Sequence, residues 1–437
     1  MRSLIREAER YFEFAALGTS WRTEFLAGVT TFMTMAYIIF VNPSILHDAG
    51  MPLAGVTAAT CLAAAVGSLL MGGFARYPIA LAPGMGLNAY FAYVVVKKMG
   101  VDWHVALGAV MISGLVFFLL TAVGVRQMIV NAIPQELYSA VAAGVGLFIA
   151  FIGLRNAGIV VSDSATLVGI GNLSDPATLL AIIGLILTGA LLCARVKAAI
   201  LIGVVATWIL SAITGTFRWH PEPYSIAGIA STAFQLNVAG ALGRGLLEII
   251  FVFLFVDLFD NVGTLVAVGK KAGLFDGTHQ IPRVNRILYS DAVATMTGAL
   301  SGTSTVVSYI ESSAGVAAGG RSGVTAIVTG LLFLVALFIA PIAGAVPESA
   351  TAPALIIVGS MMMTTAAEIE WADPGVAIPA FLTMIAIPLT FSIANGLAFG
   401  FIAYTLLKVL SGRFREVNWM VYALTALFIV RFWYLGR

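Results

Sequence analysis

The sequence is poor in charge. Of its 437 residues only 10% are charged, whereas soluble domains carry roughly 25%. So low a charged fraction argues against a soluble enzyme, a nucleic-acid-binding protein and a disordered chain. The formal net charge of +2 leaves no basic excess for binding a polyanion.

Cysteine and histidine are also scarce. The two cysteines, Cys61 and Cys193, lie in apolar runs and supply neither a disulfide framework nor a CxxC metal pair. The four histidines fall at predicted helix ends or in loops, so none is placed as a proton relay in mid-membrane. We expect no metal and no cofactor.

Apolar residues dominate instead. They make up 60% of the chain, and the mean hydropathy is +1.00. At about 20 residues per membrane-spanning helix, the chain divides into some fourteen spans with short loops, which predicts an all-α polytopic membrane protein. The predicted spans are residues 23–46, 54–73, 79–96, 104–124, 137–153, 177–194, 198–217, 245–268, 287–301, 303–319, 324–343, 350–363, 376–391 and 393–410.

Basic residues set the predicted orientation. With the N-terminus in the cytoplasm, most of the 23 Lys and Arg residues fall in cytoplasmic loops, as the positive-inside rule requires of a cell-membrane protein. Residues 1–22 mix arginines with apolar residues and predict an amphipathic cytoplasmic helix. Within 413–437, the run 417–435 combines clustered aromatics with Arg431 and is interpreted as an interfacial helix, with an extra span as the alternative.

The chain divides near its middle into two similar halves. The polar stretch 218–243 is a predicted extracytoplasmic linker, with seven spans before it and seven after it. An odd number per half gives the halves opposite orientations, which is the pattern of a 7+7 inverted repeat. In the third span proline and glycine interrupt the helix (78–90), and in the tenth hydroxyl and β-branched residues do so (301–313). Interrupted spans at matching places are typical of a transporter binding site.

The acidic residues within predicted spans all belong to the second half. They are Glu248, Asp257, Asp260, Asp291 and Glu311. Asp257 and Asp260 are three residues apart on one helix, with Thr264 one turn further. Two carboxylates this close in a low-dielectric site are not both ionised, so the cluster can bind a proton. Ionised carboxylates only accept hydrogen bonds, which favours a neutral ligand rich in N–H donors over an anion.

Three segments carry a resemblance to a known family. Residues Ala82–Tyr90, Phe255–Leu265 and Ser308–Gly315 resemble those of the nucleobase–cation symporter family, within the nucleobase–ascorbate transporter superfamily. The chain is most similar to the AzgA-like hypoxanthine–adenine–guanine permease branch, from about Thr23 to Gly412.

The resemblance implies a core domain and a gate domain, with short strands in the broken third and tenth spans. The core would hold spans 1–4 (23–124) and 8–11 (244–343), and the gate spans 5–7 (125–217) and 12–14 (344–412). It also implies that Asp260 and Glu311 contact the base from opposite sides, with Asp257 and Asn88 matching further residues of the purine branch. Gly86 would permit close backbone approach, and Phe259 and Tyr309 are candidates for stacking. Dimerisation through the gate domains is a further implication.

The expected function is import of purine nucleobases by proton symport with alternating access, and not catalysis. The proton-coupling residues are Asp260, Asp257, Glu311 and Thr264, although related uracil permeases have histidine at the Thr264 position. Na⁺ coupling stays open, as does the same fold carrying uracil, xanthine or a small anion. An intramembrane aspartyl protease would need a Gly-x-Gly-Asp segment, which the sequence lacks. A passive channel remains an alternative that uptake against a gradient would test.

Overall fold

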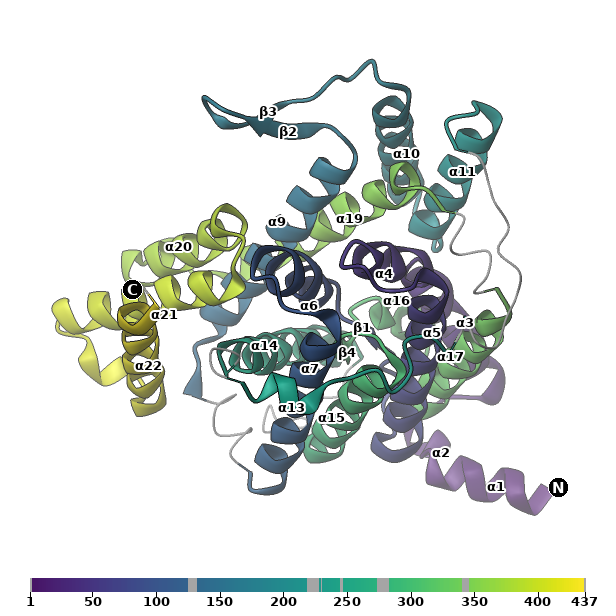
Figure 1. The fold of residues 1–437 in the computed structure, drawn as a ribbon. Coiled ribbons are helices and arrows are strands. Elements are labelled where there is room, and N and C mark those ends of the chain that lie inside the picture. The colour runs from purple at the N-terminus through teal and green to yellow at the C-terminus, as the bar shows by residue number, and fades with distance from the viewer. Residues whose placement is uncertain are drawn as a thin grey trace.

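The computed structural model describes residues 2–124, 132–217, 228, 230–243, 247–272, 283–339 and 346–435, and it is mostly helical (Figure 1). The predicted linker 218–243 and the predicted gate segment 125–217 therefore lie partly outside the described residues.

The helices of the first half follow one another with short connections. They are α1 (Arg2–Tyr11), α2 (Phe14–Leu17), α3 (Trp21–Met35), α4 (Ile38–His47), α5 (Leu53–Leu70), the π-helix η1 (Met71–Ala75), α6 (Met85–Ala89), the π-helix η2 (Tyr90–Lys98), α7 (Trp103–Ala122), α9 (Gln135–Asn156), α10 (Pro176–Cys193) and α11 (Ala199–Ile213).

The second half repeats this order. Its helices are α13 (Val238–Ala241), α14 (Leu247–Ala272), α15 (Val284–Ser301), α16 (Ser312–Ala317), α17 (Gly323–Ala336), the 3₁₀ turn η3 (Leu337–Ile339), α19 (Glu348–Met362), the 3₁₀ helix η4 (Met363–Glu368), α20 (Pro374–Thr390), α21 (Ile393–Leu410), η5 (Phe414–Glu416) and α22 (Trp419–Leu435). Every predicted span contains helix, so the prediction of a helical polytopic chain is confirmed.

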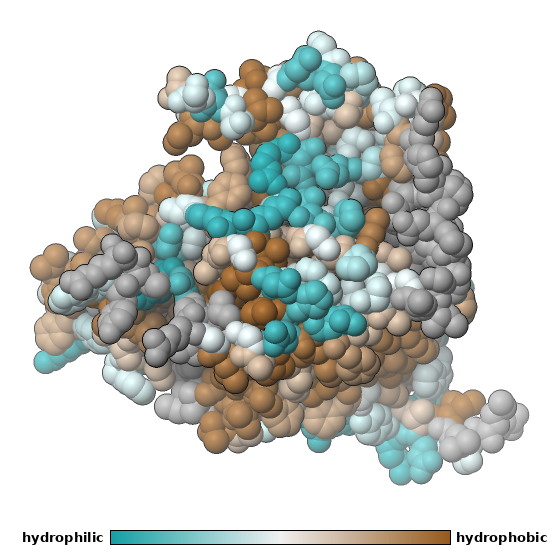
Figure 2. All heavy atoms as spheres, viewed as in Figure 1, coloured by the Kyte–Doolittle hydropathy of each residue, from teal (hydrophilic) through white to brown (hydrophobic). Residues whose placement is uncertain are grey.

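Several of these helices are long and apolar enough to cross a membrane. Within the described residues there are seven, among them α7, α9 and α10. Shorter apolar helices of 10–17 residues include α11, α17 and α20. Their outward faces carry exposed apolar side chains, such as Ile186 on α10, which is 66% exposed. Figure 2 shows hydrophilic residues gathered over the middle of one face and hydrophobic residues along its lower edge. Exposed apolar surface of this extent suits a lipid environment.

The two predicted interruptions are confirmed. In the third span the strand β1 (Leu81–Pro83) precedes α6, and in the tenth the strand β4 (Val306–Ser308) precedes α16. The two strands pair antiparallel, with Ala82 opposite Val307. Pro83 has no amide hydrogen, which disfavours an unbroken helix there. The segments come from different halves of the chain and cross in the middle of the bundle (Figure 1).

Hydroxyl side chains satisfy the strand backbones. Ser68 of α5 accepts from the Leu81 N–H at 3.0 Å and donates to the Leu81 carbonyl at 3.1 Å. Thr295 of α15 accepts from the Val306 N–H at 3.3 Å and donates to the Val306 carbonyl at 3.0 Å. Non-helical backbone inside a membrane needs such partners because lipid offers none. The second and ninth spans thus support the two broken spans equivalently.

The helices pack in two groups. The first contains α3, α4, α5, α7, α15, α16 and α17, and the second contains α9, α10, α11, α19, α20 and α21. Helix α14 packs mainly against α7 and α16 of the first group and also contacts α9. We call these the first and second helix groups.

One buried acid corrects an expectation from the sequence. Glu24 of α3 is fully buried in the first half, so the prediction that acids within spans belong to the second half is wrong. Its carboxylate accepts from the backbone N–H groups of Arg321 and Ser322 at 3.0 and 3.1 Å, and from the Thr325 hydroxyl at 2.5 Å. Glu24 thereby caps α17, an interaction between distant segments that spacing along the chain does not reveal.

The C-terminal helix α22 packs along α21. Thr425 contacts Thr405 at 2.7 Å, and Arg431 donates to Asn395 at 3.2 Å. Arg431 also forms an ion pair with Glu248 at the start of α14. These partners follow α21 from its later part back to its first turn, so α22 runs antiparallel to it.

A hairpin between α9 and α10 was missed by the sequence analysis. Strands β2 (Val160–Asp163) and β3 (Leu167–Ile170) pair antiparallel and project from the helices (Figure 1). Most residues of both strands are exposed, so their sequences lack the alternation of apolar and polar residues that predicts a half-buried strand.

Candidate functional site

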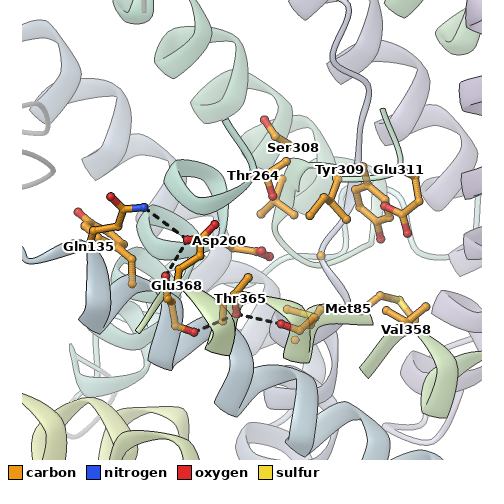
Figure 3. A pocket seen from close by; sticks show the side chains of 18 of the residues that line it. Met85, Gln135, Asp260, Thr264, Ser308, Tyr309, Glu311, Val358, Thr365 and Glu368 are labelled. Atoms are coloured by element: carbon orange, nitrogen blue, oxygen red, sulfur yellow. Dashed lines mark hydrogen bonds between the residues drawn. The ribbon is translucent and has the colours of Figure 1, made fainter. Parts of the chain in front are cut away.

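A cavity of about 270 Å³ lies where the two broken spans meet the second helix group (Figure 3). This is close to the lower end of the 300–1,000 Å³ that is usual for ligand sites. We call its two sides the first wall and the second wall. The first wall comes from the residue before α4, from α14 and from the broken spans. Its residues are Tyr37, Gly84, Met85, Gly86, Asp260, Thr264, Val307, Ser308, Tyr309, Ile310 and Glu311. The second comes from α9, α19, η4 and the residues just before α9: Ile133, Gln135, Tyr138, Ser139, Ala142, Val358, Met362, Thr365 and Glu368.

The two predicted acids, Asp260 and Glu311, both line the cavity. Asp260 comes from the middle of α14, and Glu311 follows β4 as the N-cap residue of α16. Glu311 is only 8% exposed, and Tyr37 donates its hydroxyl hydrogen to Glu311 Oε1 at 2.7 Å. The structure therefore brings together two carboxylates that are 51 positions apart in the sequence.

Glycine and tyrosine shape the crossing of the broken spans. A Cβ atom at Gly84 would lie 2.9 Å from the Val307 side chain and 3.6 Å from Asp260 Oδ2, so a side chain there would crowd the strands. A Cβ at Gly86 would collide with Val145 of α9, so glycine lets the broken third span approach α9 closely there. Tyr309 lines the cavity with its ring, while its hydroxyl donates to the Pro83 carbonyl at 2.5 Å.

Asp257 does not line the cavity. It is fully buried one turn before Asp260 and accepts from Asn261 Nδ2 at 2.6 Å. Asn261 Oδ1 in turn accepts from the backbone N–H of Ser308 at 2.8 Å. Asp257 therefore orients the amide that holds β4, which is a positioning role.

Asn88 likewise lies away from the cavity surface. It is fully buried, donates to Asn42 Oδ1 and accepts from the Ser304 hydroxyl. Asn42 also donates to Thr60 at 2.7 Å and to Thr303 at 3.0 Å. These side-chain bonds tie α6 to α4, α5 and the residues before β4.

The remaining predicted residues divide between the cavity and the core. Thr264 lines the cavity. Phe259 is buried outside it and packs against Tyr138 with ring centroids 4.6 Å apart. Asp291 is buried on α15, and Glu248 pairs with Arg431 far along α14 from Asp260.

The polar residues of the second wall were missed by the sequence analysis. Glu368 Oε2 accepts from the Ser139 hydroxyl at 3.0 Å and from Gln135 Nε2 at 3.4 Å, and Thr365 donates to the Ser139 carbonyl at 3.0 Å (Figure 3). Tyr37 of the first wall was missed as well. Gln135 and Glu368 lie just outside the predicted spans 137–153 and 350–363. Polar residues are usual at span ends, so the sequence gave no signal that these two face a cavity.

Among its described lining residues, the cavity is open to the outside at one end of the molecule. Gln135 and Glu368 are exposed, whereas Gly84, Tyr309 and Glu311 are buried. At the opposite end of α9, Tyr93 of η2 donates to Asp48 at 2.7 Å and accepts from Asn156 at 3.3 Å. These bonds join the two helix groups at the end of the molecule remote from the opening.

The charge of the lining is acidic. Among the lining residues described above there are three carboxylates and no lysine, arginine or histidine. Such a cavity accepts hydrogen bonds from N–H and O–H donors and disfavours an anion.

Comparison with known proteins gives one family and several close relatives. Residues 22–399 match the model of a permease family. A putative permease of Methanocaldococcus jannaschii is 52% identical over 99% of this chain and 100% of its own length. Adenine permease AdeP of Escherichia coli is 44% identical, covering 97% and 95% of the two chains. Guanine/hypoxanthine permease PbuG of Bacillus subtilis is 47% identical, covering 97% and 99%.

Solved structures share the fold. The transmembrane domain of the cyanobacterial bicarbonate transporter BicA aligns with a TM-score of 0.65 at 16% identity, over 87% of this chain and 97% of that one. The structure of SLC26A9 aligns with a TM-score of 0.63 at 12% identity, over 92% and 69%. At these identities the likeness concerns the arrangement of the helices alone.

Proposed function

This chain belongs to the permease family of nucleobase–ascorbate transporters, and on that premise we propose that it carries purine nucleobases across the cell membrane. The purine class is supported by its relatives, which include adenine permeases and a guanine/hypoxanthine permease at 44–47% identity over nearly the whole chain.

The observation that carries the proposal is the pair of carboxylates at the crossing of the broken spans. Asp260 and Glu311 face one cavity without a basic partner among the lining residues. A purine base presents ring N–H groups, and adenine and guanine add an exocyclic amine. Each is a donor that a carboxylate accepts. A small anion, the cargo of the bicarbonate transporter that shares the fold, would meet uncompensated negative charge here.

We assign the coupling to protons and the translocation to relative movement of the two helix groups. The first group is the proposed core domain and the second the proposed gate domain, with the domain boundaries expected from the sequence. A proton on one of the two carboxyls lets that group donate to an acceptor of the base while the other, still ionised, accepts from an N–H, so proton and substrate favour each other's binding. Coupling requires such a differential free energy. The opening at Gln135 and Glu368 and the contact of Tyr93 with Asn156 support a state open on one side, which we take to be the cytoplasmic side.

The test is uptake of labelled adenine, guanine and hypoxanthine by cells that lack purine permeases of their own. We expect uptake against a gradient, abolished by an uncoupler and unaffected by removing Na⁺. Asp260→Asn and Glu311→Gln should each reduce uptake at least tenfold. Glu348→Gln, at the N-terminus of α19 and outside the cavity lining, is the matched control and should retain it.

Three outcomes would contradict the proposal. Cells carrying the wild-type chain that concentrate no purine would overturn the substrate class. Na⁺-dependent uptake in the presence of an uncoupler would overturn proton coupling. Full proton-linked uptake in both carboxylate variants would overturn the assignment of Asp260 and Glu311.

A further inference from the structure

We propose that Glu368, together with Gln135, determines which purine is accepted, by reading the edge of the base that faces away from the first wall. The inference rests on the proposed transport of purines and extends it to the choice among them. The proposed contacts Asp260 and Glu311 come from α14 and from a broken span. Glu368 adds a carboxylate from the second helix group.

Glu368 is held in a defined position. It is the last residue of η4, the 3₁₀ helix that continues α19. Thr365 fastens this helix to α9 by donating to the Ser139 carbonyl at 3.0 Å, and Trp371 Nε1 donates to the Ala366 carbonyl at 2.9 Å just after it. The backbone around Glu368 is therefore held by two side-chain bonds to main-chain carbonyls, one before it and one after it.

The bonds of the carboxylate leave one oxygen for a ligand. Ser139 and Gln135 both donate to Oε2 of Glu368, at 3.0 and 3.4 Å. Among the described residues these are the hydrogen bonds of the carboxylate, so Oε1 accepts none of them, and Glu368 lines the cavity (Figure 3). Gln135 uses one of its two amide hydrogens on Glu368, which leaves its own Oε1 as an acceptor and its second N–H as a donor. On the polar rim of the second wall, the ionised carboxylate of Glu368 is therefore the group that presents acceptors only.

An acceptor at this place discriminates between purines by their substituents. Adenine and guanine carry an exocyclic amine that can donate to Glu368, whereas hypoxanthine carries none. Xanthine has a second carbonyl oxygen, which would face an acceptor and lose its hydration without a new bond. Sites built to bond a particular donor reject analogues that lack it.

The test measures KM and kcat for uptake of the four bases by wild type, Glu368→Gln and Glu368→Asp. We expect Glu368→Gln to raise KM for adenine and guanine about tenfold, equivalent to 1.4 kcal/mol, with kcat and the KM for hypoxanthine changed less than threefold. Because glutamine also donates, xanthine should become a competitive inhibitor. Glu368→Asp keeps the charge and should keep the order of preference.

A matched control is Glu370→Gln. Glu370 is exposed two residues further on and lines a different cavity, with Asp373 and Lys408, so its replacement should leave all four KM values unchanged. Equal changes for all bases in Glu368→Gln, or no change, would overturn the inference while leaving purine transport intact. A wild-type chain that takes up none of the bases would overturn the proposed function and this inference with it. Thermal unfolding of the purified variants in detergent separates loss of folding from loss of selectivity.

Discussion

Asn261 offers a sharp test of how β4 is held against α14. Its amide donates to Asp257 at 2.6 Å and accepts from the Ser308 N–H at 2.8 Å, all three residues being buried. Asn261→Asp removes the donor and sets two carboxylates against each other. A buried hydrogen bond to a charged group is worth about 1.5–3 kcal/mol. Asn261→Asp loses the bond to Asp257 and so displaces the side chain that holds β4, the strand that leads to Glu311; purine affinity should fall by about 10- to 100-fold.

Asp257→Asn should be milder, because an amide oxygen can still accept from Asn261. The double variant Asp257→Asn/Asn261→Asp reverses the sense of the bond: position 257 now donates, and position 261 keeps an acceptor for the Ser308 N–H. We expect it to recover much of the affinity lost in Asn261→Asp, with a coupling energy of about 1 kcal/mol or more in a double-mutant cycle.

The assay is equilibrium binding of labelled adenine to purified protein, with thermal unfolding of the same samples. Affinity and unfolding temperature should fall together in Asn261→Asp and recover together in the double variant. A double variant no better than Asn261→Asp would refute the relay from Asp257 through Asn261 to β4. So would a single Asn261→Asp variant that binds as wild type does.

Three further predictions concern other parts of the structure. Asn88→Ala should lower the unfolding temperature and the maximal uptake while leaving the order of preference among bases unchanged, since Asn88 bonds protein rather than cavity; a changed order would return it to the substrate contacts. Helix α22 should cross the membrane, because it runs antiparallel to α21, so a tag after α22 should be accessible on the side opposite to a tag before α1; labelling of both tags from one side would favour the interfacial helix instead. Hydrogen bonds from Arg413 and Lys408 lower the pKa of Glu416 to about 2; the stability that this carboxylate contributes is thus complete above its unfolded pKa of about 4.5 and is lost as the pH falls towards 2. Unfolding temperatures from pH 6 to 3 should show the loss in wild type and a smaller one in Glu416→Gln, and equal slopes would refute it.

Local sequence was sufficient for the broken spans. Pro83 and the hydroxyl-rich run before β4 disfavour helix regardless of their surroundings, and the structure has strands there. Asp260 and Glu311 could be singled out for a similar reason: carboxylates persist within apolar spans mainly where they face a cavity.

Spacing along the helix was a weaker guide to the site. Asp257 and Asp260 are close neighbours on α14, yet Asp260 lines the cavity and Asp257 bonds Asn261 behind it. A separation of three residues turns a side chain by about 60° around the axis. Which side of that arc meets the cavity depends on the helices packed around α14.

The membrane class, the helical content and the two interruptions are properties of short segments, because hydropathy and proline act where they stand in the chain. The second wall is of another kind. Gln135 begins α9 and Glu368 ends η4, 233 positions further along the chain. Only the packing of α9 against η4 brings the Gln135 amide within hydrogen-bond distance of the Glu368 carboxylate. The burial of Asn88 and the capping of α17 by Glu24 have the same origin, since each depends on partners that the other half of the chain supplies through tertiary packing.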